Sequence, residues 1–249
     1  MKRAKWLILI GFGIVALSPL YLWERARDPA PEFSYYLESP SAMRLVEVMS
    51  GRPDHERRDV VRKALEAGQV SFREEKISSP VFNGNNLVAE LGQGGNILIF
   101  SAHMDRVVEA PGANDNASCV AAGIEAMKEL SKSLTSEGLR LRFLFTDGEE
   151  SGLHGARLHA GSNDLTHVIG VASFEMCGIG DAYGIWDVVG PAVESPIVKA
   201  LQKAGDNLNI YNGIHGAVPR FGSDHLAFSK KGLAAVGVTM LPKKDEDKL

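Results

Sequence analysis

Six residues that can bind a metal ion or move a proton lie in four short segments of the sequence: His103, Asp105, Asp115, Glu149, Glu150 and Glu175. This many carboxylates can share a small cleft in ionised form only if cations offset their mutual repulsion. A single imidazole among several carboxylates favours zinc, manganese or cobalt over calcium or magnesium. The residue types therefore indicate metal-assisted hydrolysis, provided that the fold brings them together.

Spacing suggests a role for each of these side chains. Asp115 can give one carboxylate oxygen to each of two metal ions, a recurring arrangement in hydrolases. Adjacent residues project in different directions, so we expect Glu150 to bind metal and Glu149 to act as general base. Glu149 would take a proton from the attacking water and pass it to the leaving amine. Asp105 is expected to hold the free ring nitrogen of His103 and fix its tautomer.

Each segment, taken alone, has an ordinary structural explanation. A lone His-x-Asp usually has no function, and an acidic pair after a strand is usually a solvated helix start. Gly-Ala-Asn-Asp-Asn is most often a turn with a helix cap. Glu175 is harder to explain in this way because an unpaired buried carboxylate is costly. The hypothesis of a site rests on the combination, with each member near the end of an expected strand.

Helical and strand patterns alternate along the chain. Helices are expected over 40–50, 54–67, 117–134, 151–160 and 224–231 and from 195 onward, and strands over 70–77, 86–91, 96–101, 139–146, 168–174 and 234–240. This alternation predicts an α/β fold, a three-layer sandwich with a mostly parallel, mixed central sheet between helices. Sites in such folds form beyond the carboxyl ends of the strands, so the six residues should meet at one edge of the sheet.

Residues 1–28 form a segment of a different kind. They contain five basic and two acidic residues, which leaves 22 basic and 29 acidic residues for the rest of the chain. The uncharged stretch 6–23 would reach about 27 Å as a helix, close to the hydrocarbon thickness of a bilayer. The basic residues that precede it favour a cytoplasmic N-terminus. We therefore predict a membrane anchor with the remainder extracytoplasmic, periplasmic or extracellular; a cleaved signal peptide and a secreted protein are the alternative.

A linker over 29–39 and a catalytic domain over 40–249 complete the predicted organisation. The composition excludes collagen, coiled coil and wholesale disorder, and the net charge of −4 argues against a nucleic-acid partner. Two cysteines, Cys119 and Cys177, are too few for a disulfide scaffold. Both are expected near the metal site, where a disulfide or two buried free thiols would fit, and free thiols are favoured.

Four motifs carry a resemblance to a known family. They are Ser-Ala-His-Met-Asp at 101–105, Pro-Gly-Ala-Asn-Asp-Asn-Ala-Ser at 111–118, Phe-Thr-Asp-Gly-Glu-Glu-Ser-Gly at 145–152 and Phe-Gly-Ser-Asp-His at 221–225. Together they resemble the zinc-dependent exopeptidases, the family of bacterial leucyl aminopeptidase, aminopeptidase Y, glutamate carboxypeptidase II and glutaminyl cyclase. The resemblance covers roughly residues 40–241 and implies a sheet of the phosphorylase/hydrolase-like type.

The resemblance implies two zinc ions bridged by Asp115. His103 and Glu175 would complete one site, and Glu150 would form part of the other. Most members carry Asp where this chain has Glu175, whose longer side chain could still reach the metal. The resemblance also implies a cis peptide bond between Asp115 and Asn116.

Two further roles follow from the resemblance. It implies Glu149 as the general base, in agreement with the assignment made from the residues. It also implies that Asp224 and His225 lie near the substrate, although Asp224 could instead only cap its helix.

The last metal ligand of the family has no counterpart here. It is a His in a His-Thr-x-x-Asp segment after the strand that corresponds to 234–240, whereas this chain continues into a charged segment, 243–249, without His. We expect that the sequence is truncated. The alternatives are that His225 substitutes for the missing ligand or that one metal site is impaired.

The predicted function is that of a metal-dependent aminopeptidase, with zinc as cofactor and peptides as substrates. A glutaminyl-peptide cyclase-like enzyme is the alternative within the same fold. A catalytically impaired binding domain that retained the fold is the alternative of another class.

Overall fold

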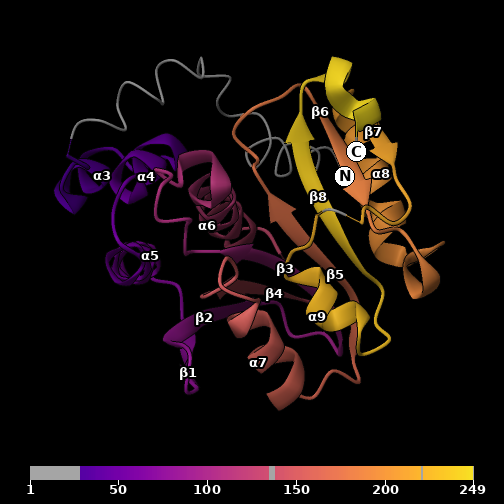
Figure 1. Cartoon of the computed structure of the whole chain (residues 1–249), viewed down its shortest axis with the longest axis horizontal. Helices are drawn as coiled ribbons and strands as arrows, with labels where there is room; N and C mark the ends of the chain where they lie inside the picture. Colours follow the sequence, from indigo (N-terminus) through magenta and orange to yellow (C-terminus); the bar gives the residue numbers. More distant parts are fainter. Residues whose placement is uncertain (1–28, 135–137, 220, 249) are drawn as a thin grey trace.

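The computed structural model describes residues 29–134, 138–219 and 221–248 (Figure 1). The anchor expected over 1–28 lies outside these residues. Of the helices within the described ranges, none has both the length and the apolar character needed to cross a membrane.

Eight strands of the described chain form one mixed sheet in the order β1-β2-β4-β3-β5-β8-β6-β7. They are β1 (Phe72–Ser78), β2 (Asn83–Leu91), β3 (Asn96–His103), β4 (Leu139–Thr146), β5 (Val168–Glu175), β6 (Ala182–Trp186), β7 (Tyr211–Ile214) and β8 (Ala235–Leu241). The four central strands, β4, β3, β5 and β8, run parallel. Antiparallel pairings attach β2 and β6 on either side of them. The predicted mostly parallel, mixed central sheet is confirmed.

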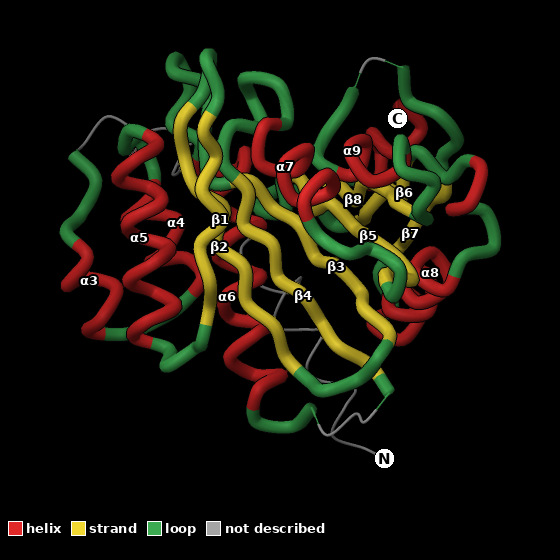
Figure 2. Tube along the Cα trace, turned by 90° about the horizontal axis from the view of Figure 1, so that it is seen from below, coloured by secondary structure: helices red, strands yellow, loops and turns green. Residues whose placement is uncertain are grey.

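Helices cover both faces of this sheet (Figure 2). They are α3 (Phe33–Glu38), α4 (Ala42–Met49), α5 (Asp54–Ala67), α6 (Ser118–Ser131), α7 (His154–Ser162), α8 (Pro196–Leu208) and α9 (His225–Ser229). One core cluster joins α4, α5, α6 and α8 to the sheet, and a second joins α7 and α9 to the opposite face. These layers match the predicted three-layer sandwich.

Local sequence accounts for where several helices begin. Ser195 caps α8, since its hydroxyl accepts a hydrogen bond from the amide of Val198 at 3.4 Å, and Pro196 occupies the first helical position. Ser41 caps α4 in the same way, accepting from the amide of Arg44 at 3.3 Å. The expected strand–helix alternation is therefore supported by cap chemistry as well as by apolar periodicity.

Three elements differ from the sequence-based expectation. The linker expected over 29–39 contains helix α3, and Tyr36 of this helix is fully buried in the core. Strands β6 and β7 were not predicted. They are five and four residues long, and Gly184 and Gly213 interrupt their apolar pattern. Short strands of this kind form because a neighbouring strand is available, which the local sequence does not reveal.

The register of the parallel strands creates the edge on which the candidate residues gather. His103 at the end of β3 is paired with Thr146 at the end of β4. Glu175 ends β5 and is paired with Thr239 of β8. The segments that follow β3, β4 and β5 therefore leave the sheet side by side.

Substitutions in strand β4 can test whether both faces of the sheet are packed. Leu144 and Phe145 are both fully buried, Leu144 in the cluster with α7 and α9 and Phe145 in the cluster with α6. We expect Leu144→Ala to lower the free energy of unfolding by about 2–5 kcal/mol and Phe145→Ala by about 3–5 kcal/mol, because each leaves a cavity. Urea unfolding measures both, and Val81→Ala, at a site 80% exposed, is the control. If either core variant loses no more free energy of unfolding than the control, the face of the sheet on which its residue lies is not packed.

Candidate metal centre

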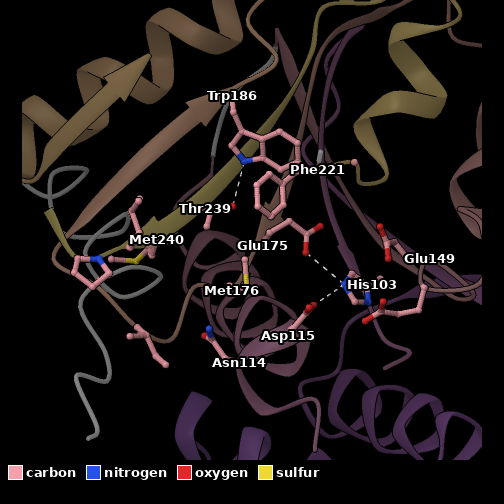
Figure 3. Close-up of a pocket in the computed structure, with 15 residues that line it drawn as sticks. His103, Asn114, Asp115, Glu149, Glu175, Met176, Trp186, Phe221, Thr239 and Met240 are labelled. Atoms are coloured by element: carbon pink, nitrogen blue, oxygen red, sulfur yellow. Dashed lines mark hydrogen bonds and ion pairs between the residues drawn. The ribbon is translucent and has the colours of Figure 1, made fainter. Parts of the chain in front are cut away.

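Five of the six residues singled out line one pocket at the carboxyl edge of the sheet (Figure 3). They are His103, Asp115, Glu149, Glu150 and Glu175. The sixth, Asp105, is buried beside the pocket. The remaining wall is largely apolar, with Met176, Ile179, Trp186, Phe221, Met240, Leu241 and Pro242, and is completed by Asn114, Gly222 and Thr239.

His103 lies at the centre of this group. Its Nε2 is 3.0 Å from Asp115 Oδ1 and 3.3 Å from Glu175 Oε2, as the dashed lines in Figure 3 indicate. One ligand atom from each of these three residues lies within 4.8 Å of the others. This is the set that was expected to form the first metal site.

A second group shares the same imidazole. Ligand atoms of His103, Glu149 and Glu150 also lie within 4.8 Å of one another. By geometry alone, both glutamates could bind a metal ion. The positions of Glu149 and Glu150 do not show which is the metal ligand and which is the general base, so this assignment stays a prediction.

Asp105 contacts His103 through its side chain and through its backbone. The carboxylate Oδ1 pairs with the Nδ1 of His103 at 3.5 Å, and the backbone oxygen of Asp105 lies nearer to this nitrogen, at 3.1 Å. The carboxylate also accepts hydrogen bonds from the amides of Glu149, at 3.1 Å, and Glu150, at 3.0 Å. Asp105 therefore lies at the free ring nitrogen of His103, and its carboxylate also joins the loop after β3 to the loop after β4.

The position of Glu175 is fixed by three donors. Asn116 Nδ2 donates to Oε2 at 2.8 Å, Ser173 Oγ donates to Oε1 at 3.2 Å, and Ser223 Oγ donates to the same oxygen. Asn116 also donates to the backbone oxygen of Phe174 at 2.8 Å. The peptide bond between Asp115 and Asn116 is cis, as the resemblance implied. The longer glutamate therefore reaches the imidazole while both its oxygens are held.

When no cation is bound, the surroundings of Glu149 and Glu150 disfavour the ionised forms of these two carboxyl groups. Burial raises the pKa of Glu149 to about 9, and the nearby carboxylates of Asp224 and Glu175 raise it further against the opposing charge of His103. Burial also raises the pKa of Glu150. Desolvation alone would lower the pKa of His103, but the surrounding carboxylates outweigh it and raise this pKa well above its ordinary value.

The side chains present fit a divalent cation. Asp115 Oδ1 is buried, and within the described part of the chain it accepts no hydrogen bond of regular geometry despite its closeness to His103. An oxygen in this state is costly unless a cation or a water molecule meets it. One imidazole with several carboxylates is a donor set suited to zinc.

Asp224 and His225, expected near the substrate, lie behind the pocket wall in this structure. Both side chains are fully buried at the start of α9, and neither lines the pocket. Asp224 accepts hydrogen bonds from the hydroxyls of Ser101, at 2.9 Å, and Thr146. Because burial removes Asp224 from water, it raises the pKa of this carboxyl to about 6.

His225 is likewise engaged away from the metal ligands. Its Nε2 lies 2.9 Å from Asp187 Oδ2, and its ring contacts Trp186 edge-on. It belongs to neither of the metal-ligand groups found among the described residues. The alternative in which it replaces the missing ligand therefore has no geometric support.

The two cysteines are bonded to each other. Cys119 and Cys177 form a disulfide with Cα atoms 5.3 Å apart, contrary to the preference for free thiols. The bond links the first turn of α6, just after Asp115, to the segment just after Glu175. The spacing in sequence, 58 residues, gave no signal of this pairing, which depends on where β5 ends relative to α6.

Several residues that support the site had escaped the sequence analysis. Trp186 and Phe221 line the pocket, and the hydroxyls of Ser173 and Ser223 hold Glu175. Phe221 and Ser223 both belong to the Phe-Gly-Ser-Asp-His motif at 221–225. The polar side chain of Ser223 within this motif was a signal for its role. Trp186 is the last residue of β6, a strand that the sequence did not reveal, and offered no such signal.

Comparisons with known proteins agree with this geometry. Residues 86–248 match the peptidase family M28. The probable lipoprotein aminopeptidase LpqL of Mycobacterium tuberculosis is 36% identical over 99 residues, covering 39% of this chain and 20% of that protein. The leupeptin-inactivating enzyme 1 of Streptomyces exfoliatus is 26% identical over 186 residues, which are 72% of this chain and 41% of that protein. The chain thus spans less than half the length of these curated relatives.

Solved structures show the same fold. The aminopeptidase from Aneurinibacillus sp. strain AM-1 superposes with a TM-score of 0.55 and 26% identity, over 64% of this chain and 40% of that one. The glutaminyl cyclase of Porphyromonas gingivalis gives a TM-score of 0.66 at 17% identity, over 83% of this chain and 84% of that one.

The raised carboxyl pKa values make the stability of the metal-free chain depend on pH. In the folded chain Glu149 and Asp224 hold their protons at a higher pH than in the unfolded chain. As pH rises, the unfolded chain therefore loses these protons at a lower pH than the folded chain does. Because the folded state then binds more protons, the free energy of unfolding should fall as pH rises from about 5 to about 9. Replacing Glu149 by Gln removes one of these groups and should flatten that decline.

Urea unfolding in the presence of a chelator, repeated across this pH range, measures the effect. Glu109→Gln is the matched control because Glu109 is exposed and lies outside the pocket. Equal pH slopes for the wild type and Glu149→Gln would contradict the assignment of a raised pKa to Glu149.

Proposed function

Because the chain belongs to peptidase family M28, we propose that it is a zinc-dependent aminopeptidase, which hydrolyses the N-terminal residue from peptides. The observation that carries the proposal is the convergence of His103, Asp115, Glu150 and Glu175 on one pocket together with a protonatable Glu149. Aminopeptidases among the relatives and among the solved structures of the same fold support it.

Two ions per chain are proposed, with Asp115 shared between them. His103 and Glu175 would hold one ion with Asp115, and Glu150 would help to hold the other. When bound, zinc lowers the pKa of a water molecule and polarises a carbonyl group. Asn116 and the two serines keep the Glu175 carboxylate facing the imidazole.

Glu149 is proposed to move the proton. It lies in the pocket near His103, and its environment favours the protonated state. Cations nearby would lower its pKa toward the neutral range, in which a general base is most effective. Glu149 would then accept a proton from water and deliver it to the nitrogen of the leaving amine.

The pocket walls support an N-terminal, apolar specificity. Aminopeptidases among the relatives support cleavage at the N-terminus of a peptide. Beside the candidate ligands, Trp186, Phe221 and Met240 offer apolar surface to the first side chain of the substrate. We therefore propose that peptides with an apolar N-terminal residue are preferred.

The N-terminal 28 residues are proposed to anchor the protein with its catalytic domain outside the cytoplasm. The basic residues before the uncharged stretch 6–23 support this orientation. The disulfide between Cys119 and Cys177 also supports it, since such bonds persist in oxidising compartments.

On expression in a bacterial host, the full chain should sediment with membranes and be digested by protease added to cells whose outer membrane has been permeabilised. Protection of the catalytic domain from that protease would contradict the orientation.

Replacing Glu149 by Gln tests the proposed chemistry. We expect kcat for an aminoacyl anilide to fall about 10²–10⁴-fold, because the carboxylate that moves the proton is gone. Zinc content, measured on the purified protein, should stay the same if Glu149 is not a ligand. Glu109→Gln should keep the activity of the wild type. Full activity in Glu149→Gln would remove Glu149 from the mechanism, and loss of zinc would make it a ligand.

Product analysis separates hydrolysis from its alternatives. With substrates that begin with glutamine, a hydrolase incorporates oxygen from ¹⁸O-labelled water into the released amino acid. A cyclase instead releases ammonia and leaves a cyclised peptide without the label. A chain that binds zinc but yields neither product would be the impaired binding domain.

A further inference from the structure

Arg57, on helix α5, is fully buried directly behind the metal centre. Its Nε donates to the backbone oxygen of Met104 at 2.5 Å, and its Nη2 donates to the backbone oxygen of Gly112 at 3.1 Å. Its Nη1 donates to the backbone oxygens of Met49, at 3.2 Å, and Pro111, at 3.5 Å. Among the described residues, no carboxylate accepts a hydrogen bond from this guanidinium.

Burying a charged guanidinium in this way is costly unless its surroundings compensate it fully. Burial lowers the pKa of Arg57 to about 10, and the negative charges of Asp54, Asp105 and Asp115 oppose that shift, so Arg57 remains charged at neutral pH. A hydrophobic residue would fill the same space without a buried charge, but it would leave the four backbone oxygens without this donor. The guanidinium therefore does more than fill space.

Three of the four carbonyl groups that accept from Arg57 belong to two segments of the metal centre, and the fourth, that of Met49, ends helix α4. Met104 lies between His103 and Asp105, and Gly112 lies three residues before Asp115. A single planar guanidinium thus holds both segments by a fork of donors in fixed geometry.

Gly112 shows how closely the second segment approaches Arg57. Its φ is +66°, a left-handed conformation, and a Cβ atom at this position would lie 2.7 Å from Arg57 Nη1. Only glycine allows the backbone to rest against the guanidinium in this conformation.

The next residue of α5 holds the third segment. Arg58 forms an ion pair with the Oδ2 of Asp147, whose side chain is almost completely buried. The same oxygen accepts a hydrogen bond from the backbone amide of Asn85 at 3.1 Å. Asp147 lies two residues before Glu149. Adjacent residues of a helix project about 100° apart, which lets the two arginines reach different segments.

We propose that Arg57 and Arg58 are positioning residues that together fix segments 103–105, 111–115 and 147–150 in the relative arrangement that metal binding needs. Both lie on α5, which precedes residues 86–248, the part of the chain matched to the family. The inference rests on the proposed function, because the side chains positioned are its metal ligands and its base.

Zinc affinity is the first test. We expect Arg57→Lys, in the full chain, to bind zinc about 10–100-fold more weakly, because lysine keeps the charge but loses the fork of donors that fixes the ligands. Competition with a chromophoric chelator measures the dissociation constant, and circular dichroism establishes that the variant is folded. Arg62→Lys is the matched control, since Arg62 lies on the same helix but, among the residues that the structure describes, pairs only with Asp59 and Glu74.

Amide hydrogen exchange, measured without zinc, is the second test. Arg57→Lys should accelerate exchange in 103–106 and 111–116, and Arg58→Lys should accelerate it in 147–150, while the central strands keep their protection. A merely structural role would instead speed exchange throughout the molecule. If Arg57→Lys does not fold, exchange and zinc affinity in Arg58→Lys decide the proposal.

Either of two results would overturn the inference. One is a zinc affinity in the folded variants equal to that of Arg62→Lys, and the other is an exchange change that is absent from these segments or spread over the whole chain. If the wild-type chain itself binds no zinc, the proposed function fails, and the exchange pattern alone decides the positioning role.

Discussion

Repulsion among carboxylates around a single imidazole is the constraint on which the rest of the structure depends. Asp115, Glu149, Glu150 and Glu175 face the same pocket, and like charges at such separations would move apart if their backbones allowed it. The chain meets this constraint with a rigid scaffold. Each acidic side chain is attached to a strand end or to a loop tied to a neighbouring loop, so that the ligands stay in place whether bound protons or a cation relieve the repulsion.

The parallel centre of the sheet provides the first level of this scaffold. Strands β3, β4 and β5 end side by side, which gathers residues more than 70 positions apart in sequence at one edge. Both faces of these strands are covered by helices, so the strand ends cannot shift without opening the core. The geometry of the pocket is therefore linked to the packing of the whole domain.

Connections between loops provide the second level. The Asp105 carboxylate accepts both amides of the glutamate pair, and Asn116 bonds to Glu175 and to the backbone beside it. The disulfide joins the same two regions as Asn116. Each contact links the segment that follows β3 to the end of β4 or β5 or to the segment just after it, so that a displacement of one is resisted by its neighbour.

Local sequence patterns indicated the layers of the fold and the imidazole and carboxyl groups that face the pocket. Strand patterns, caps and the His-x-Asp, Asn-Asp-Asn and Glu-Glu segments are local, so they could be identified without knowing what lies opposite them. Tertiary structure alone decided that Asp224 and His225 turn inward, that Cys119 meets Cys177, and that Asp105 bonds to two amides. It also decided that Arg57 lies behind the site. These features depend on which distant groups share a buried space, because a buried polar group takes whichever partner the packing brings within reach.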